Sequence, residues 1–145
     1  MKKICSVIGF LLLAGTVTVV AQSAVAVPFI GRHAQDVEKY IRQNLRELSL
    51  DQTTLNTAYK YLKYQDQLGY MTLLVFLSED DTCTWYKGVY DPDWMERIIQ
   101  DLNACCKRES DTSWIEISGD LTYRKVLKED QWFFSVTTKP VSRTP

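Results

Sequence analysis

The sequence MTLLVFLSEDDTCTWYKGVYDPDWMERIIQDLNACC, residues 71–106, contains the clearest secondary-structure pattern in the chain. It predicts a strand over Tyr70–Leu77, a polar turn, and a second, antiparallel strand over Thr82–Val89. Asp91 can then cap the free backbone amides of a helix whose first position is taken by Pro92, which has no amide hydrogen. The helix is expected to continue to the end of the stretch. These residues therefore predict a β-hairpin followed by a helix.

Periodicity extends this prediction to both sides. Before the hairpin, apolar residues at helical spacing predict an amphipathic helix over Ala34–Leu48, and the tyrosine-rich segment Tyr59–Tyr64 favours a strand over a competing helical alignment. After the second helix, three further strands are expected, at Trp114–Ser118, Leu121–Leu127 and Trp132–Thr138. The resulting element order is αβββαβββ. It predicts a single α+β domain with two helices packed on an antiparallel sheet.

The first residues have the three-part layout of a secretory signal peptide. Lys2 and Lys3 form a positive start, residues 4–20 are almost wholly apolar, and small residues follow. Cleavage is expected after Ala26, and a cut after Ala21 fits nearly as well. A retained membrane anchor is the alternative, but the apolar run is shorter than the roughly 20 residues that usually span a bilayer.

The chain is expected to divide into a signal peptide (1–26), a single α+β domain (27–138) and a flexible tail (139–145). It has 17 basic and 18 acidic residues, and the signal holds two lysines and no acid, which leaves 15 basic and 18 acidic residues and a net charge of −3. This mixed charge lacks the cationic excess of nucleic-acid binders. We therefore expect a secreted or periplasmic protein with no nucleic-acid partner and no stable membrane anchor after cleavage.

Three cysteines lie beyond the signal, at Cys83, Cys105 and Cys106. Because export places them in an oxidising compartment, we expect Cys83 to form a disulfide with either Cys105 or Cys106. The enclosed loop would stabilise the fold by about 3 to 4 kcal/mol. The third cysteine would remain as a buried apolar side chain, an intermolecular link or a reactive thiol, and a bond between the two neighbouring cysteines would be strained.

No catalytic, metal or cofactor motif is present in the sequence. The only histidine, His33, lies far along the chain from the cysteines, which disfavours a zinc site. There is no Gly-x-Ser-x-Gly motif and no glycine-rich phosphate loop. We therefore expect a protein that is not an enzyme and that holds no metal and no cofactor.

Aromatic residues are the remaining feature that suggests a function. Trp85, Tyr86, Tyr90 and Trp94 lie on or beside the predicted hairpin and helix start, where they could form a binding surface. The signal segment, size and element order resemble those of small exported bacterial proteins. The main hypothesis is an exported binding module for a protein, peptide or glycan. The alternatives are an inhibitor or immunity-type protein of an extracytoplasmic enzyme, and a thiol-dependent enzyme that uses an unpaired cysteine.

Overall fold

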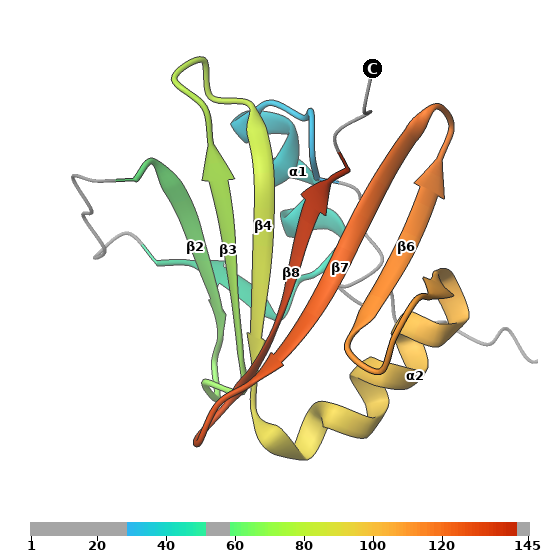
Figure 1. The fold of residues 1–145 in the computed structure, drawn as a ribbon. Helices are drawn as coiled ribbons and strands as arrows, with labels where there is room; N and C mark the ends of the chain where they lie inside the picture. Colours follow the sequence, from blue (N-terminus) through green and yellow to red (C-terminus); the bar gives the residue numbers. More distant parts are fainter. Residues whose placement is uncertain (1–28, 52–58, 142–145) are drawn as a thin grey trace, which may run out of the picture.

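The computed structural model describes residues 29–51 and 59–141, so the expected signal peptide and its cleavage site lie outside the described residues. The described chain forms two α-helices, one 3-10 turn and eight strands (Figure 1). The helical elements are α1 (Ala34–Asn44), η2 (Pro92–Trp94) and α2 (Met95–Cys105). The strands are β1 (Leu48–Leu50), β2 (Tyr61–Asp66), β3 (Met71–Leu77), β4 (Cys83–Tyr90), β5 (Lys107–Arg108), β6 (Ser113–Ser118), β7 (Leu121–Glu129) and β8 (Phe134–Pro140).

All eight strands belong to one antiparallel sheet in the order β1-β2-β3-β4-β8-β7-β6-β5. The predicted α+β class with an antiparallel sheet is therefore confirmed. The element order differs from αβββαβββ because each helix is followed by four strands instead of three. The two halves of the chain meet where β4 pairs with β8, so the last strand of each half lies at the centre of the sheet.

The two strands that the sequence did not predict are β1 and β5, which form the two edges of the sheet. They have three and two residues, too few to show an alternating pattern. The segment Ala34–Leu48 was predicted to be helical throughout, but α1 ends at Asn44 and the chain turns into β1. The weakly supported strand over Tyr59–Tyr64 is confirmed as β2, displaced by two residues.

The C-terminal boundary of the domain also differs from the prediction. Strand β8 continues through Pro140, two residues past the expected domain end at Thr138. The backbone amide of Val141 donates to the carbonyl of Thr122 on β7 at 2.8 Å. The first residues of the expected tail are therefore part of the sheet.

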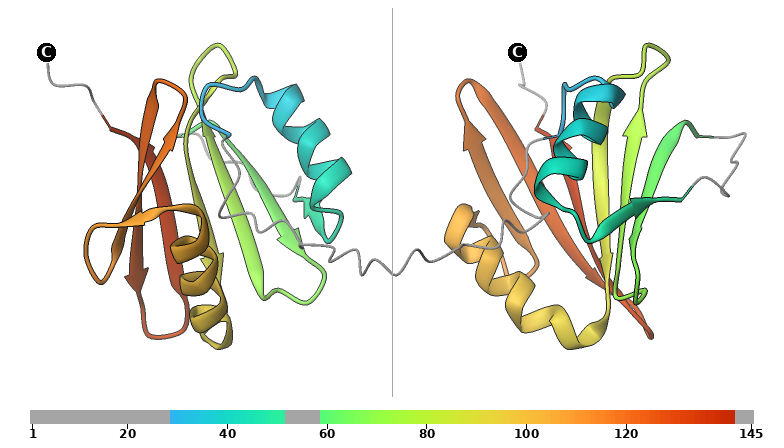
Figure 2. Two further views of the ribbon diagram at one scale, coloured as in Figure 1. Left: turned by 90° about the vertical axis from the view of Figure 1, so that its right-hand side faces the viewer. Right: turned by 180° about the vertical axis from the view of Figure 1, so that it is seen from behind.

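The sheet has two different faces, which we call the covered face and the open face. Seen from behind, both helices lie in front of the strands and over the same side of the sheet (Figure 2). Buried side chains from both helices and from the strands form one apolar cluster on this covered face. Its helical members are Val37, Ile41, Ile98 and Leu102, and its strand members include Leu73, Val75, Tyr86 and Val136.

The start of the second helix follows the prediction. The Asp91 side chain accepts a hydrogen bond from the backbone amide of Asp93 at 2.9 Å, and Pro92 occupies the first turn. The first turn is a 3-10 turn, η2, and the α-helix proper begins at Met95. The cap thus fixes the point where the chain leaves β4 and crosses to the second half of the sheet.

Candidate functional site

The four aromatic residues that were predicted to form a binding surface do not share one surface. Successive side chains of β4 point to opposite faces of the sheet. Tyr86 and Tyr90 are each 3% exposed and belong to the buried cluster, whereas Trp85 is partly exposed on the open face. Trp94 lies beyond the end of the strand, where its ring contacts Tyr70 at 6.4 Å between centroids.

The two buried tyrosines have structural contacts. The ring of Tyr86 meets Phe29 edge-on at 5.1 Å, and the ring of Tyr90 stacks on Phe134 at 5.2 Å. Burial raises the pKa of both hydroxyl groups above the ordinary tyrosine value, so both are protonated at neutral pH. These residues build the core and offer no ring to a ligand on the open face.

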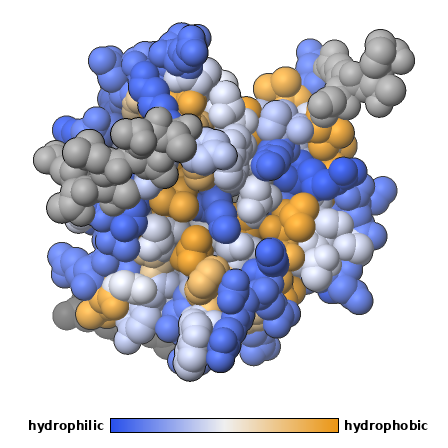
Figure 3. Space-filling model, turned by 60° about the vertical axis from the view of Figure 1, so that its left-hand side comes forward, coloured by the Kyte–Doolittle hydropathy of each residue, from blue (hydrophilic) through white to orange (hydrophobic). Residues whose placement is uncertain are grey.

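A row of three aromatic side chains crosses the open face instead. In the strand register Tyr61 lies opposite Phe76, and Phe76 lies opposite Trp85. The ring centroids of Phe76 and Trp85 are 3.6 Å apart and nearly parallel, and Tyr61 is 5.6 Å from Phe76. Of the predicted binding residues, Trp85 alone contributes to this row. A view from the β2 side shows hydrophobic residues exposed among hydrophilic ones (Figure 3).

Beside this row, strands β4, β8 and β7 form a groove of about 580 Å³ on the open face. The residues that line the groove are neighbours because of the register in which these three strands pair. Lys87 lies opposite Thr137, which lies opposite Val126, and Lys139 lies opposite Arg124. Serine, threonine and apolar residues complete the surface between the charged ones. The lining residues are Lys87, Arg124, Val126, Lys128, Ser135, Thr137, Lys139, Pro140 and Val141.

The lining of this groove, which we call the cationic groove, contains four cations and no carboxylate. Arg124 donates to Glu109 at 3.1 Å in an exposed ion pair, and the Lys139 ammonium lies 4.9 Å from the centre of the Trp85 ring. Within residues 29–51 and 59–141, no acidic side chain forms an ion pair with Lys87, Lys128 or Lys139. The groove therefore presents a positive surface although the chain as a whole is slightly acidic.

The covered face has a cation of a different kind. Lys125 is fully buried, and its ammonium donates to the carboxylate of Glu116 at 2.9 Å, the hydroxyl of Tyr86 at 3.1 Å and the hydroxyl of Thr138 at 3.4 Å. Burial on its own lowers the pKa of Lys125, but Tyr86 and Glu116 outweigh it and the net direction is upward. Lys125 therefore stays charged at neutral pH with all three of its donors satisfied.

Neither the cationic groove nor the buried lysine was predicted from the sequence. A signal for Lys125 was present, because it alternates with Tyr123 and Leu127 and so had to share their buried face. The groove had a weaker signal, since its cations come from three strands and become neighbours only through the β4–β8 pairing. That pairing joins segments about fifty residues apart and has no local pattern in the sequence.

The predicted disulfide between Cys83 and the end of α2 is not present. All three cysteines are free, and the Cys83 thiol donates to the carbonyl of Trp85 at 3.7 Å. Cys106 directly precedes β5, which lies four strand positions from β4. At the usual spacing this is roughly 19 Å measured along the sheet. Burial raises the pKa of the Cys83 thiol to about 12.

Among the residues that the structure describes, no group of three or more histidine, cysteine or acidic side chains could hold a metal ion. Neither of the described helices is long and apolar enough to cross a membrane. Comparison with protein-family models gives no match, and neither the curated proteins nor the solved structures provide a significant one. The geometry of the open face is therefore the basis for a functional proposal.

Proposed function

We propose that this chain is an exported, non-enzymatic binding module whose cationic groove binds an extended acidic segment of a partner protein. The observation that carries the proposal is that the described lining has four cations and no carboxylate, on a sheet face that neither described helix covers. Surface cations gathered on one face attract an acidic partner and orient it during encounter. The buried Lys125, by contrast, has partners for all of its donors.

The shape and lining of the groove favour a protein segment as the ligand. Val126, Pro140 and Val141 supply apolar area between the cations, which suits a segment that alternates acidic and apolar side chains. A glycan would be expected to stack on exposed aromatic faces. Here Phe76 stacks on Trp85, and Lys139 lies over the Trp85 ring, so these ring faces already have contacts.

An inhibitor or immunity-type role is a special case of this proposal. In that case the acidic segment would belong to an extracytoplasmic enzyme, and binding would block it. The cationic groove would supply the contact in either role. The two roles differ only in whether the partner loses activity when it is bound.

Binding can be measured on the processed protein by fluorescence anisotropy with a labelled ten-residue peptide of alternating glutamate and leucine. We expect the double variant Lys87→Glu and Lys128→Glu to bind at least tenfold more weakly than the wild type. The matched control is the double variant Lys39→Glu and Arg46→Glu, which changes the net charge by the same amount at two exposed positions outside the groove. Affinity should also fall as salt is added, because exposed charges are screened.

An equal loss of affinity in this control variant would show that net charge alone governs the binding and would contradict the proposal. A peptide of alternating lysine and leucine should not bind. If a neutral oligosaccharide bound with greater affinity than the acidic peptide, the ligand would be a glycan and not a protein segment.

A further inference from the structure

The two neighbouring cysteines at the end of α2 have their thiols in contact. The sulfur atoms of Cys105 and Cys106 are 2.7 Å apart. Cys105 is exposed and Cys106 partly so, whereas Cys83 is buried in the core. We call Cys105 and Cys106 the cysteine pair. Its two sulfur atoms are close enough to bond to each other when an oxidant accepts their electrons, and they are accessible to solutes.

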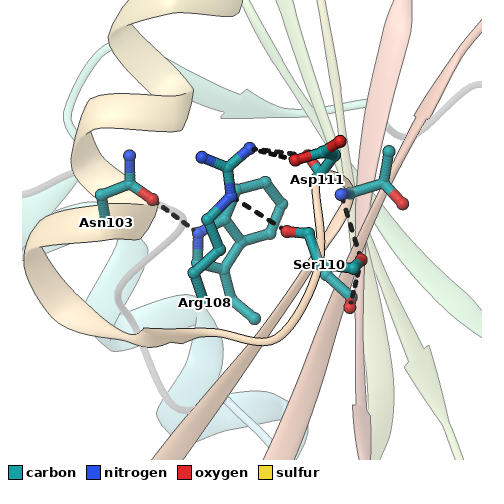
Figure 4. Close-up of polar contacts among 7 residues, drawn as sticks. Asn103, Arg108, Ser110 and Asp111 are labelled. Atoms are coloured by element: carbon teal, nitrogen blue, oxygen red, sulfur yellow. Dashed lines mark hydrogen bonds and ion pairs between the residues drawn. The ribbon is translucent and has the colours of Figure 1, made fainter.

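Residues that precede and follow the cysteine pair in the sequence make side-chain contacts, and Figure 4 shows those of Asn103 and Arg108. On the helix side, the Asn103 side chain accepts a hydrogen bond from the indole of the fully buried Trp114 at 2.8 Å. On the strand side, Arg108 donates to the carbonyl of Ser110 at 2.9 Å, and its guanidinium lies 5.7 Å from the centre of the same Trp114 ring. Both flanks of the pair are thus anchored to one buried residue.

We propose that the cysteine pair is a redox site that exchanges with low-molecular-weight disulfides to form a disulfide between Cys105 and Cys106. In the first step the Cys105 thiolate attacks one sulfur of the small disulfide, a mixed disulfide forms, and one small thiolate leaves. In the second step the Cys106 sulfur, having lost its proton to solvent, attacks the Cys105 sulfur and expels the second small thiolate. The two protein thiols are oxidised, and the small disulfide is reduced to two thiols.

The environment makes Cys105 the attacking residue. It is the more exposed of the two, so a small disulfide reaches it first. The hydrogen bond between the two thiols lowers the pKa of Cys105 and raises the pKa of Cys106. Of the more distant charges, Lys125 favours the Cys105 thiolate and Glu116 opposes it. A thiolate at Cys105 with a protonated neighbour is the arrangement that the first step needs.

The resulting bond is expected to be easily reversed. Adjacent Cα atoms lie about 3.8 Å apart across a trans peptide bond, closer than the roughly 4.4 to 6.8 Å of ordinary disulfides. The bond between neighbouring residues is therefore strained, and strained, exposed disulfides are the labile ones. The cysteine pair thus fits a reversible redox response better than a permanent structural link.

The test is to incubate the native, processed protein with oxidised glutathione, trap it with an alkylating reagent and measure its mass without reduction. The wild type should lose two hydrogens and carry no glutathione, and peptide mapping should place the bond between Cys105 and Cys106. The Cys106→Ser variant should retain one glutathione on Cys105 in nearly every molecule. The Cys83→Ser variant should react like the wild type, and circular dichroism should show that each variant is folded.

Two results would overturn the proposal. One is a stable glutathione adduct on wild-type Cys105, which would mean that Cys106 does not resolve the mixed disulfide. The other is a bond that includes Cys83 or a second molecule. Dithiothreitol should return the oxidised wild type to the free dithiol without unfolding it, and a bond that needs denaturant before it is reduced would contradict the expected lability.

Discussion

The two faces of the sheet differ in how their positively charged side chains are placed: the lysine on the covered face is buried and paired, and the lysines on the open face line a groove. On the covered face, Lys125 is fully buried and donates to three acceptors from three other strands. On the open face, Lys87, Lys128 and Lys139 lie in a groove whose lining contains no carboxylate. Lys125 and Lys128 are only three positions apart on one strand and point to opposite sides of it.

This difference separates a structural role from a binding role. A buried charge must be paired because burying it alone is very costly, and once paired it connects the strands that supply its partners. An exposed charge contributes little to stability and remains available to a ligand. We therefore expect substitutions on the covered face to change stability, and substitutions in the cationic groove to change binding.

The largest expected effect on stability is that of Lys125→Ala. Removing the ammonium leaves the Glu116 carboxylate, the Tyr86 hydroxyl and the Thr138 hydroxyl without their shared donor. We therefore expect the free energy of unfolding to fall by about 3 to 5 kcal/mol. Unfolding in urea, followed by tryptophan fluorescence, measures this loss. A loss below 1 kcal/mol would mean that the buried network is not important for stability.

A second covered-face position, Gly88, is expected to be nearly as sensitive. A Cβ placed there would lie 2.2 Å from the Tyr90 hydroxyl oxygen and 2.5 Å from the adjacent ring carbon, and the Tyr90 ring is buried and stacks on Phe134. Gly88→Ala should therefore cost about 1 to 3 kcal/mol through overpacking. The matched control is Lys87→Ala, the adjacent open-face residue, and an equal cost in both variants would contradict the assignment of the two faces.

The covered face should also make the fold sensitive to alkaline pH. Burial raises the pKa of Tyr64 and of Cys83 to about 12 from ordinary values of 10.0 and 9.0. Because the folded chain holds these protons more tightly than the unfolded chain, their contribution is complete below pH 9 and is lost as the pH rises toward 12. Urea unfolding at pH 8 and pH 11 should show that the free energy of unfolding falls by roughly 2 to 4 kcal/mol at the higher pH, and unchanged stability would contradict this prediction.

The smallest effect on stability is expected for Lys128→Ala in the cationic groove. The side chain is exposed and makes no ion pair within the described residues, so the change should stay within about 0.5 kcal/mol. The same variant should bind the acidic peptide more weakly than the wild type. A loss of stability without a loss of binding would reverse the roles of the two faces.

The sequence predicted those parts of the fold that have a local pattern. The α+β class, both helices and six of the eight strands follow from periodicity, and the helix start follows from the cap at Asp91 and Pro92. The strands β1 and β5 were missed because two or three residues show no period. Their existence depends on pairing with β2 and β6.

The candidate site was harder to predict from the sequence because it depends on the pairing of strands that lie far apart in the chain. Alternation along β4 already separated Trp85 from Tyr86, and applying it to the site would have removed Tyr86 and Tyr90 from the proposed surface. The β4–β8 pairing, in contrast, has no local signature, and it is this pairing that brings Lys87 beside Thr137. The same strand order places β8, β7 and β6 between Cys83 and the cysteine pair. The sequence had instead predicted a disulfide between Cys83 and one cysteine of the pair.

The most direct test of the binding account is nuclear magnetic resonance of the ¹⁵N-labelled protein titrated with the peptide of alternating glutamate and leucine. We expect the backbone amide signals of β4, β7 and β8 around Lys87, Lys128 and Lys139 to shift with peptide concentration, and those of α1 and α2 to stay unchanged. The Lys87→Glu and Lys128→Glu double variant should show no such shifts. Shifts that concentrate on the helices, or that persist unchanged in the double variant, would contradict the claim that the open face is the binding surface.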